Sequence, residues 1–154
     1  MDKPDRIDEF KELCRRRGIP MTPQRRAVFE AILARGDHPT ADQVFEEVHK
    51  RLADVSKATV YRVLERLVEA GLVRRVVHSG MPARFDADLT RHHHATCRRC
   101  GRILDVRDPK LDAIDIPSEL QEHFEVEDFC VQFFGLCFEC RSQAGEQPDL
   151  TTSA

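Results

Sequence analysis

Four of the six cysteines form two matched pairs, and each pair has two residues between its thiols: Cys97 with Cys100, and Cys137 with Cys140. Two intervening residues let one tight turn present both sulfurs to a single ion, and Gly101 suits the bend after the first pair. Two redox disulfides would use the same residues, but two pairs at this spacing are more typical of zinc. Four thiolates leave zinc no open position, so the pattern predicts a structural Zn²⁺ site.

A second group of potential ligands surrounds a run of three histidines. Side chains alternate along an extended segment, so His92 and His94 are expected on one face and His93 on the other. Asp86 precedes this run, and Asp105 follows the first cysteine pair. Imidazoles and carboxylates together suit Fe²⁺, Mn²⁺ or Zn²⁺. A solvated polar loop has the same composition, and the residues alone leave both interpretations open.

The chain ahead of these ligands has the pattern of short helices followed by a β-hairpin. Thr22, Thr40 and Ser56 are expected N-caps, because their hydroxyls can accept a backbone N–H of the first turn. Apolar residues recur at helical spacing over 5–17, from Pro23 to Gly36, over 41–52 and over 57–70. Strands are expected at 72–78 and 83–86, joined by a turn at 79–82. This order is that of a winged helix-turn-helix domain.

The C-terminal half has the pattern of a small α+β unit, which makes the predicted fold class of the whole chain α+β. Strands are expected at 94–97, 102–106 and 125–134, with a short helix capped by Ser118 before the last strand. That last strand is apolar enough to pair across a subunit interface. From about Ser142 the chain is rich in Gln, Gly, Pro and Thr, and we expect residues 142–154 to be disordered.

Charge and hydropathy narrow the class of protein. The net charge of the chain is −3, but residues 1–84 carry a net charge of +4 and residues 85–154 carry −7. This asymmetry suggests that the basic N-terminal half binds phosphates. No apolar run would span a membrane and no export signal is recognisable, so we expect a cytoplasmic protein without a membrane partner. There, cysteines are metal ligands or free thiols rather than disulfides. Cys14 and Cys130 lack partner spacing and are expected to be buried apolar side chains.

Several short motifs, in this order along residues 8–141, resemble those of the ferric uptake regulator family. They are Thr22-Pro23-Gln24-Arg25, His38-Pro39-Thr40-Ala41, Ala58-Thr59-Val60-Tyr61-Arg62, Arg84-Phe85-Asp86, His92-His93-His94-Ala95-Thr96-Cys97, and Gly135-Leu136-Cys137. The resemblance implies a winged-helix DNA-binding domain in 1–84, a hinge in 85–90, and a dimerisation and metal-binding domain with a four-cysteine zinc site in 91–141. It also implies a homodimer that binds a double-stranded DNA operator as a repressor.

The resemblance places a regulatory metal site on His38, Asp86, His92, His94 and Asp105. Fe²⁺ or Mn²⁺ is the implied ion, with Zn²⁺ as an alternative. The first ligand comes from the DNA-binding half and the last three come from the dimerisation half. An ion that bridges two domains binds only the orientation that brings its ligands together, so metal would select one conformer.

A second metal site found in many members of the family does not carry over to this chain. Its positions here are Arg91, His93, Asp112 and Phe129, and neither Arg nor Phe can bind a metal. We therefore expect one sensing ion per subunit, with His93 either facing solvent or supporting the neighbouring ligands.

Two features point to different branches of the family. Aspartate at both 86 and 105 resembles the peroxide-sensing branch, in which peroxide oxidises ligating histidines, here His38 and His92. Arg62 in the base-reading helix resembles the iron-uptake branch instead. The aspartates favour peroxide sensing, while an iron- or zinc-uptake regulator is the alternative.

The exposed face of helix 57–70 is expected to read DNA. Arg62 can bind a guanine edge in bidentate fashion, and Tyr61 can meet a thymine methyl group or a phosphate. The candidate phosphate contacts, which position the protein without specifying sequence, are Lys57, Thr59, Arg15, Arg16 and Arg25.

We do not expect this protein to be an enzyme or to bind a small organic substrate. Five protein ligands leave little room for a metal-activated water, and no glutamate is set beside the cluster. A zinc-dependent protein-interaction module would not need Tyr61 and Arg62, and it would leave the basic half unexplained.

Overall fold

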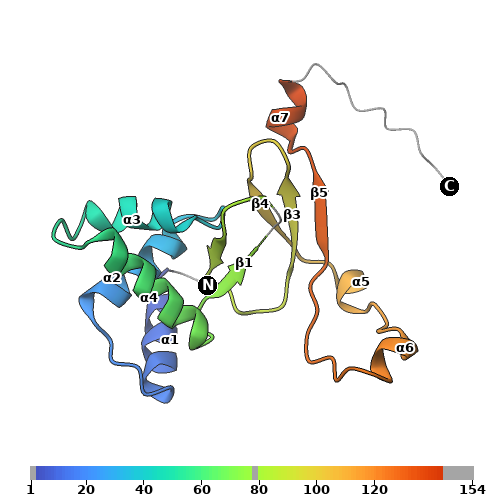
Figure 1. Ribbon diagram of the computed structural model, residues 1–154, viewed down its shortest axis with the longest axis horizontal. Helices are drawn as coiled ribbons and strands as arrows, with labels where there is room; N and C mark the ends of the chain where they lie inside the picture. The colour runs from blue at the N-terminus through green and yellow to red at the C-terminus, as the bar shows by residue number, and fades with distance from the viewer. Residues whose placement is uncertain (1–2, 78–79, 144–154) are drawn as a thin grey trace. The chain divides into compact units, whose positions relative to one another are not determined.

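The computed structural model describes residues 3–77 and 80–143, which form two compact units separated in sequence between Thr90 and Arg91 (Figure 1). The N-terminal unit contains α1 (Lys3–Arg16), α2 (Pro23–Ala34), α3 (Ala41–His49), α4 (Lys57–Glu69), β1 (Arg74–Val76) and β2 (Arg84–Asp86). The C-terminal unit contains β3 (His93–Cys97), β4 (Ile103–Val106), α5 (Pro109–Asp112), α6 (Ser118–Gln121), β5 (Gln132–Gly135) and α7 (Phe138–Ser142). The α+β fold class is confirmed.

Hydroxyl side chains begin α2, α3 and α4 as expected. Thr22 accepts a hydrogen bond from a backbone N–H at the start of α2, and Ser56 does the same for α4. At α3 the capping box is complete: Thr40 accepts from the backbone N–H of Gln43 at 3.3 Å, and the Gln43 side chain accepts from the Thr40 backbone at 2.9 Å. These bonds satisfy N–H groups that have no partner inside the helix, and they fix where each helix starts.

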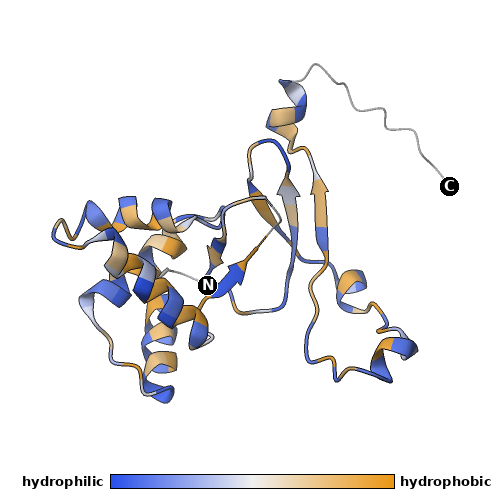
Figure 2. Cartoon of the chain, in the orientation of Figure 1, coloured by the Kyte–Doolittle hydropathy of each residue, from blue (hydrophilic) through white to orange (hydrophobic). Residues whose placement is uncertain are grey.

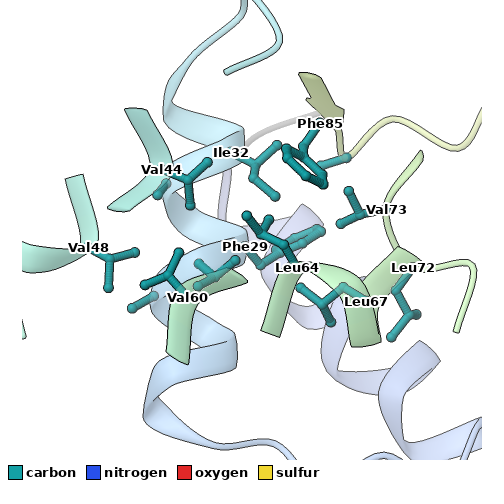
Figure 3. Packing of buried hydrophobic residues seen from close by; sticks show 14 of the residues in the cluster. Phe29, Ile32, Val44, Val48, Val60, Leu64, Leu67, Leu72, Val73 and Phe85 are labelled. Atoms are coloured by element: carbon teal, nitrogen blue, oxygen red, sulfur yellow. The ribbon is translucent and has the colours of Figure 1, made fainter. Parts of the chain in front are cut away.

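The helices of the N-terminal unit enclose one apolar core (Figure 3). Phe10 of α1 stacks on Phe29 of α2, with ring centroids 3.7 Å apart. Leu64 and Leu67 of α4 are fully buried in the same cluster. The other residues of the cluster that are labelled in Figure 3 are Ile32, Val44, Val48, Val60, Leu72, Val73 and Phe85. Burial of this apolar area is the main term that stabilises the unit.

The hairpin is shorter than expected. β1 and β2 pair antiparallel over three residues each, with Arg74 opposite Asp86. Leu72 and Val73, predicted to start the first strand, pack into the helical core instead. His78 and Ser79, at the end of the predicted strand and the start of the turn, lie outside the described residues.

The C-terminal unit is built on a three-stranded sheet in the order β4-β3-β5. β3 pairs antiparallel with β4 and parallel with β5, so the chain between β4 and β5 must cross from one edge of the sheet to the other. The predicted strand over 125–134 was too long, since β5 covers only Gln132–Gly135. No residue from 107 to 131 is buried, which removes the packing that would hold a longer strand.

Expectations about the C-terminal part of the chain had mixed outcomes. The short helix predicted near Ser118 is present as α6, but its N-cap is Pro117 and no side chain caps it, so the predicted cap at Ser118 was wrong. The short helices α5 and α7 escaped prediction, because four or five residues are too few to show a helical period. Ser142 ends α7 instead of beginning a disordered tail, and residues 144–154 of that predicted tail lie outside the described residues. Residues 87–92 have no regular structure, and a hinge at 85–90 stays a prediction.

The two remaining cysteines differ from each other. Cys14 is buried in the core of the N-terminal unit, as predicted. Cys130 is exposed, so the prediction for it was wrong. It lies in the chain between β4 and β5, where no side chain is buried. In the described part of the chain, no helix combines the length and the apolarity that crossing a membrane requires.

Truncating Leu64 to alanine should destabilise the N-terminal unit by about 2–5 kcal/mol, because the side chain is fully buried and its loss leaves a cavity. Urea unfolding followed by helical circular dichroism measures this change. Arg66→Ala, at an exposed position of the same helix, is the control and should change stability by less than about 0.5 kcal/mol. A cost below about 1 kcal/mol for Leu64→Ala would contradict the assigned core.

Candidate metal sites and a candidate DNA-binding helix

The four paired cysteines converge in the C-terminal unit. Cys97 ends β3, Cys137 caps α7, and Cys140 lies within α7. All four sulfurs lie within 4.8 Å of one another, and those of Cys100 and Cys137 are 3.7 Å apart. Sulfurs about 2.3 Å from a tetrahedral zinc lie about 3.8 Å apart, so the cluster has the dimensions of a zinc site.

The first cysteine pair is held in a tight turn. The backbone N–H of Gly101 donates to the carbonyl of Cys97 at 2.9 Å. Gly101 has a φ of +71°, a conformation that costs a residue with a Cβ more than it costs glycine. This turn therefore explains both the two-residue spacing and the glycine that follows it.

The thiols of the cluster differ in acidity. Burial raises the pKa of the Cys97 thiol, but backbone hydrogen bonds, first from Cys100 and then from Cys137, bring it down to about 6. Burial and hydrogen bonds with the other thiols raise the pKa of Cys140 to about 12. The cluster thus favours one thiolate and resists further negative charge. A divalent cation relieves this repulsion, so the donor set fits zinc.

In the N-terminal unit, His38 and Asp86 form the first of two His/Asp groups. Nε2 of His38 lies 3.6 Å from Oδ2 of Asp86, and both side chains are buried. Donor atoms about 2.1 Å from one ion lie about 3–4 Å apart, so this pair has the spacing of two ligands.

Backbone contacts hold the His38 loop against β2. Thr40 forms an isolated bridge with Arg84, and the backbone N–H of Phe85 donates to the Pro39 carbonyl at 3.0 Å. His38 itself has a φ of +54°. A left-handed histidine costs about 1–3 kcal/mol and persists only where its surroundings hold it. The hydrogen bonds around the loop supply that restraint.

In the C-terminal unit, His92, His94 and Asp105 form the second group. The imidazole rings of His92 and His94 meet edge to face with centroids 4.7 Å apart. Nε2 of His92 lies 3.7 Å from Oδ1 of Asp105, and Asp105 stands opposite His94 in the β3–β4 ladder. The predicted shared face of His92 and His94 is therefore present, and register brings Asp105 to it.

Two neighbours of this group were misjudged or missed from the sequence. His93 is fully buried, so of its two expected roles the solvent-facing one was wrong. Cys130 Sγ lies 3.5 Å from Nδ1 of His94, a contact that helps to orient that ring. Sequence spacing carries no sign of this contact, because Cys130 comes from a distant part of the chain.

Helix α4 presents the residues predicted to face DNA. Lys57, Tyr61 and Arg62 are exposed, and Thr59 is partly buried. The Tyr61 hydroxyl donates to Asp42 at 2.6 Å, and Lys57 pairs with the same carboxylate at 2.7 Å. Arg62 lies 3.5 Å from the Thr59 hydroxyl. The predicted face of α4 is thus outward, with three polar side chains already oriented by neighbours.

The other three predicted phosphate contacts differ in their exposure and in the groups that they contact. Arg15 and Arg16 are exposed at the end of α1, where both pair with Glu12 at 2.7 and 2.9 Å. Arg25 is only partly exposed, and its guanidinium donates to the Pro20 carbonyl. Exposed ion pairs contribute little, about 0–1 kcal/mol, so Arg15 and Arg16 can exchange Glu12 for a phosphate.

Comparison with known proteins covers most of the chain. Residues 16–134 match the model of the ferric uptake regulator family. The chain is 30% identical over 137 residues to a peroxide-responsive repressor, PerR, of Staphylococcus epidermidis, covering 89% of this chain and 91% of that protein.

Two solved structures share its fold. The Helicobacter pylori ferric uptake regulator has a TM-score of 0.70 at 19% identity, with 92% of this chain and 95% of that chain covered. A zinc uptake regulator complexed with zinc and DNA has a TM-score of 0.68 at 20% identity, with 94% and 99% covered. Family members are regulators of transcription rather than enzymes. The family match and the 30% identical relative together show that the chain belongs to the ferric uptake regulator family.

Proposed function

We propose that this chain is a metal-dependent transcriptional repressor that binds operator DNA as a homodimer. The observation that carries the proposal is the pair of His/Asp groups, one in each unit: His38 with Asp86, and His92 and His94 with Asp105. Neither group alone fills the coordination sphere of a sensing ion. The relative at 30% identity is named a repressor, which supports the regulatory role.

Metal would act by joining the two groups. An ion that takes ligands from both units binds only the arrangement that brings them together, so its occupancy selects one orientation of α4 relative to the dimerisation unit. If that orientation spaces the two α4 helices of a dimer by one DNA turn, about 34 Å, metal and operator bind cooperatively. A coupling of about 1–3 kcal/mol is usual for such systems.

The four cysteines serve a different purpose in this proposal. Zinc there has four sulfur ligands and no open position, so it stabilises the C-terminal unit without sensing. That unit buries few apolar side chains of its own, chiefly Cys97, Ile103 and Cys140. Metal binding can supply about 10 kcal/mol or more to the folding of such a small unit. A regulator of this design acts where its DNA is, in the cytoplasm.

The stimulus we propose is peroxide, sensed through Fe²⁺ at the regulatory site. Asp86 and Asp105 favour this branch, and the relative from Staphylococcus epidermidis is named peroxide-responsive. Fe²⁺ held by these residues would catalyse a reaction in which one oxygen of peroxide bonds to an imidazole carbon and the other leaves as water, so that the imidazole is the two-electron reductant. Oxygen added to the imidazole of His38 or His92 lowers its ability to bind metal, and the two units are then no longer joined.

An iron-, manganese- or zinc-responsive repressor without peroxide sensing is the second candidate. Arg62 favours it, because arginine at this place of the base-reading helix resembles the iron-uptake branch. Both candidates share the DNA-binding face and the metal sites, and they differ only in what happens to the ligating histidines under peroxide.

His38→Ala should weaken Mn²⁺-dependent operator binding by about 5–150-fold, the usual range of such a coupling, since one ligand of the joining ion is lost. Fluorescence anisotropy with labelled operator measures this, and zinc content and dimer mass should not change. His49→Ala, at an exposed position of α3, is the matched control. Loss of zinc or of the dimer in His38→Ala would refute the separate roles of the two sites.

Arg62→Ala should reduce discrimination between operator and random DNA, because a bidentate arginine contributes about 1–3 kcal/mol of base specificity. Lys57→Ala, in contrast, should weaken binding to both DNAs equally and lower the dependence of affinity on salt. Titrations of both DNAs at several salt concentrations separate the two effects. Undiminished discrimination in Arg62→Ala would remove this residue from base reading.

Brief exposure of the Fe²⁺-loaded protein to hydrogen peroxide should add one oxygen atom to His38 or His92. Peptide mass spectrometry locates the added 16 Da, a shift set by the mass of oxygen, roughly one part in a thousand of the 17.7 kDa chain. The same protein loaded with Mn²⁺ is the control. Unmodified histidines, together with operator binding that persists after the exposure, would favour the second candidate.

A further inference from the structure

The long connection from β4 to β5 needs an anchor that its own burial does not supply. Residues 107–131 include no buried residue, and α5 and α6 are four residues each. The connection must nevertheless deliver β5 in register beside β3, with Gln132 opposite His94. Contacts between residues 107–131 and the start of β3 must therefore hold this connection in position.

One anchor is the ring of His93, which is fully buried. Its Nδ1 accepts a hydrogen bond from the backbone N–H of Val131 at 3.1 Å, so in the neutral ring the proton sits on Nε2. That Nε2 lies 3.3 Å from Oδ1 of Asp112, the last residue of α5. The Phe129 ring stacks on the imidazole at 6.2 Å between centroids and 22° between planes.

The second anchor is Arg91. Its guanidinium carbon lies 4.2 Å from the centroid of the Phe129 ring. Its Nε lies 3.6 Å from Oδ1 of Asp112 and 3.9 Å from Oδ1 of Asp128. The guanidinium thus stacks on an aromatic face while its charge offsets two carboxylates. We call Arg91, His93, Asp112, Asp128 and Phe129 the Arg91 cluster.

The segment held by this cluster also contacts the backbone on which two candidate metal ligands stand. The backbone N–H of His94 donates to the Val131 carbonyl at 3.1 Å. The Cys130 thiol lies 3.7 Å from the carbonyl oxygen of His92 and 3.5 Å from Nδ1 of His94. A shift of this segment would therefore move His92 and His94 as well.

We propose that the Arg91 cluster positions His92 and His94, so that their side chains are arranged for a metal before any metal arrives. The side chains of β3 alternate, which places His93 in the cluster while its two neighbours share the other face. Arg91 and Phe129 thus act as positioning residues and bind no ion themselves. The inference rests on the proposed function only in taking His92 and His94 as ligands of the sensing ion.

Within the cluster the aromatic ring matters more than the charges. The ion pairs of Arg91 are 42–58% exposed and gain little in water. Phe129 and Asp112 each contact both His93 and Arg91. Because the Asp112 carboxylate is 43% exposed, its ion pairs hold the two anchors together less strongly than the Phe129 ring does. Phe129→Leu should therefore have a larger effect than Arg91→Gln, and Phe129→Tyr should preserve function because it keeps the ring.

The test uses the full chain with its zinc bound and Mn²⁺ as the probe. Free Mn²⁺ measured by electron paramagnetic resonance gives the affinity of the regulatory site. Hydrogen exchange of the amides of His94 and Val131 reports directly on the two hydrogen bonds that join β3 to the returning segment. Lys110→Gln is the matched control, because it removes a positive charge from α5 outside the cluster.

Phe129→Leu is expected to weaken Mn²⁺ binding about 10–100-fold, the usual effect of losing a residue that orients a ligand, and to speed exchange at both amides. Arg91→Gln should show a smaller change in the same direction, while Phe129→Tyr and Lys110→Gln should match the unmodified protein. Unchanged exchange in Phe129→Leu and Arg91→Gln would overturn the proposal. If Phe129→Leu fails to fold, Arg91→Gln against Phe129→Tyr decides it by the same measurements.

A different result would show that the proposed function is wrong, and it can be told apart from failure of the Arg91 cluster proposal. If the unmodified zinc-bound protein took up no Mn²⁺, the sensing site would be refuted, while amide exchange would still decide whether the cluster holds the segment.

Discussion

Hydrogen bonding of β3 to both of its neighbours determines where two sets of candidate metal ligands lie. β3 is the central strand of its sheet, with β4 on one side and β5 on the other. His92 precedes the strand and His94 lies near its start, whereas Cys97 ends it. Register with β4 places Asp105 opposite His94, and register with β5 brings Gly135, shortly before Cys137, opposite Cys97. A one-residue slip of β4 would move Asp105 away from His94, and a one-residue slip of β5 would move Cys137 away from Cys97.

The N-terminal unit holds two features on one packed core. One is α4, whose polar face points outward, and the other is His38, whose backbone is in the left-handed conformation. Its apolar core fixes α4 through Val60, Leu64 and Leu67, and the residues between them are left to face outward. The same core includes Phe85, whose backbone ties β2 to the loop that carries His38. The candidate DNA face and the candidate metal ligands of this unit therefore depend on a single packed cluster.

The C-terminal unit is stabilised differently, because it buries few apolar side chains. Exposed aromatic residues lie along β5 and α7, among them Phe133, Phe134 and Phe138, and Figure 2 shows the apolar colour of β5. An exposed apolar edge strand of this kind favours association with a second subunit, which agrees with the proposed homodimer. The four-cysteine cluster at one end of β3, with the zinc proposed for it, and the Arg91 cluster at the other end would supply the order that a larger core would give.

Residue type and spacing were sufficient for the parts of this protein that depend on local chemistry. Two cysteine pairs predict a closed zinc site, hydroxyl caps predict the starts of α2, α3 and α4, and alternation predicts the shared face of His92 and His94. Each cysteine pair, each cap and the alternation of the histidines involve residues only a few positions apart, so their signal is contained in short stretches of sequence.

Only the tertiary structure determined the features that depend on contacts between residues far apart in the sequence. The extent of β5, the exposure of Cys130 and the burial of His93 follow from how residues 107–131 cross the sheet, and no local pattern encodes that crossing. The pairing of His38 with Asp86 likewise depends on the bridge between Thr40 and Arg84. Spacing along the chain identifies atoms that can bind a metal, whereas only the fold brings those atoms within a few ångströms of one another.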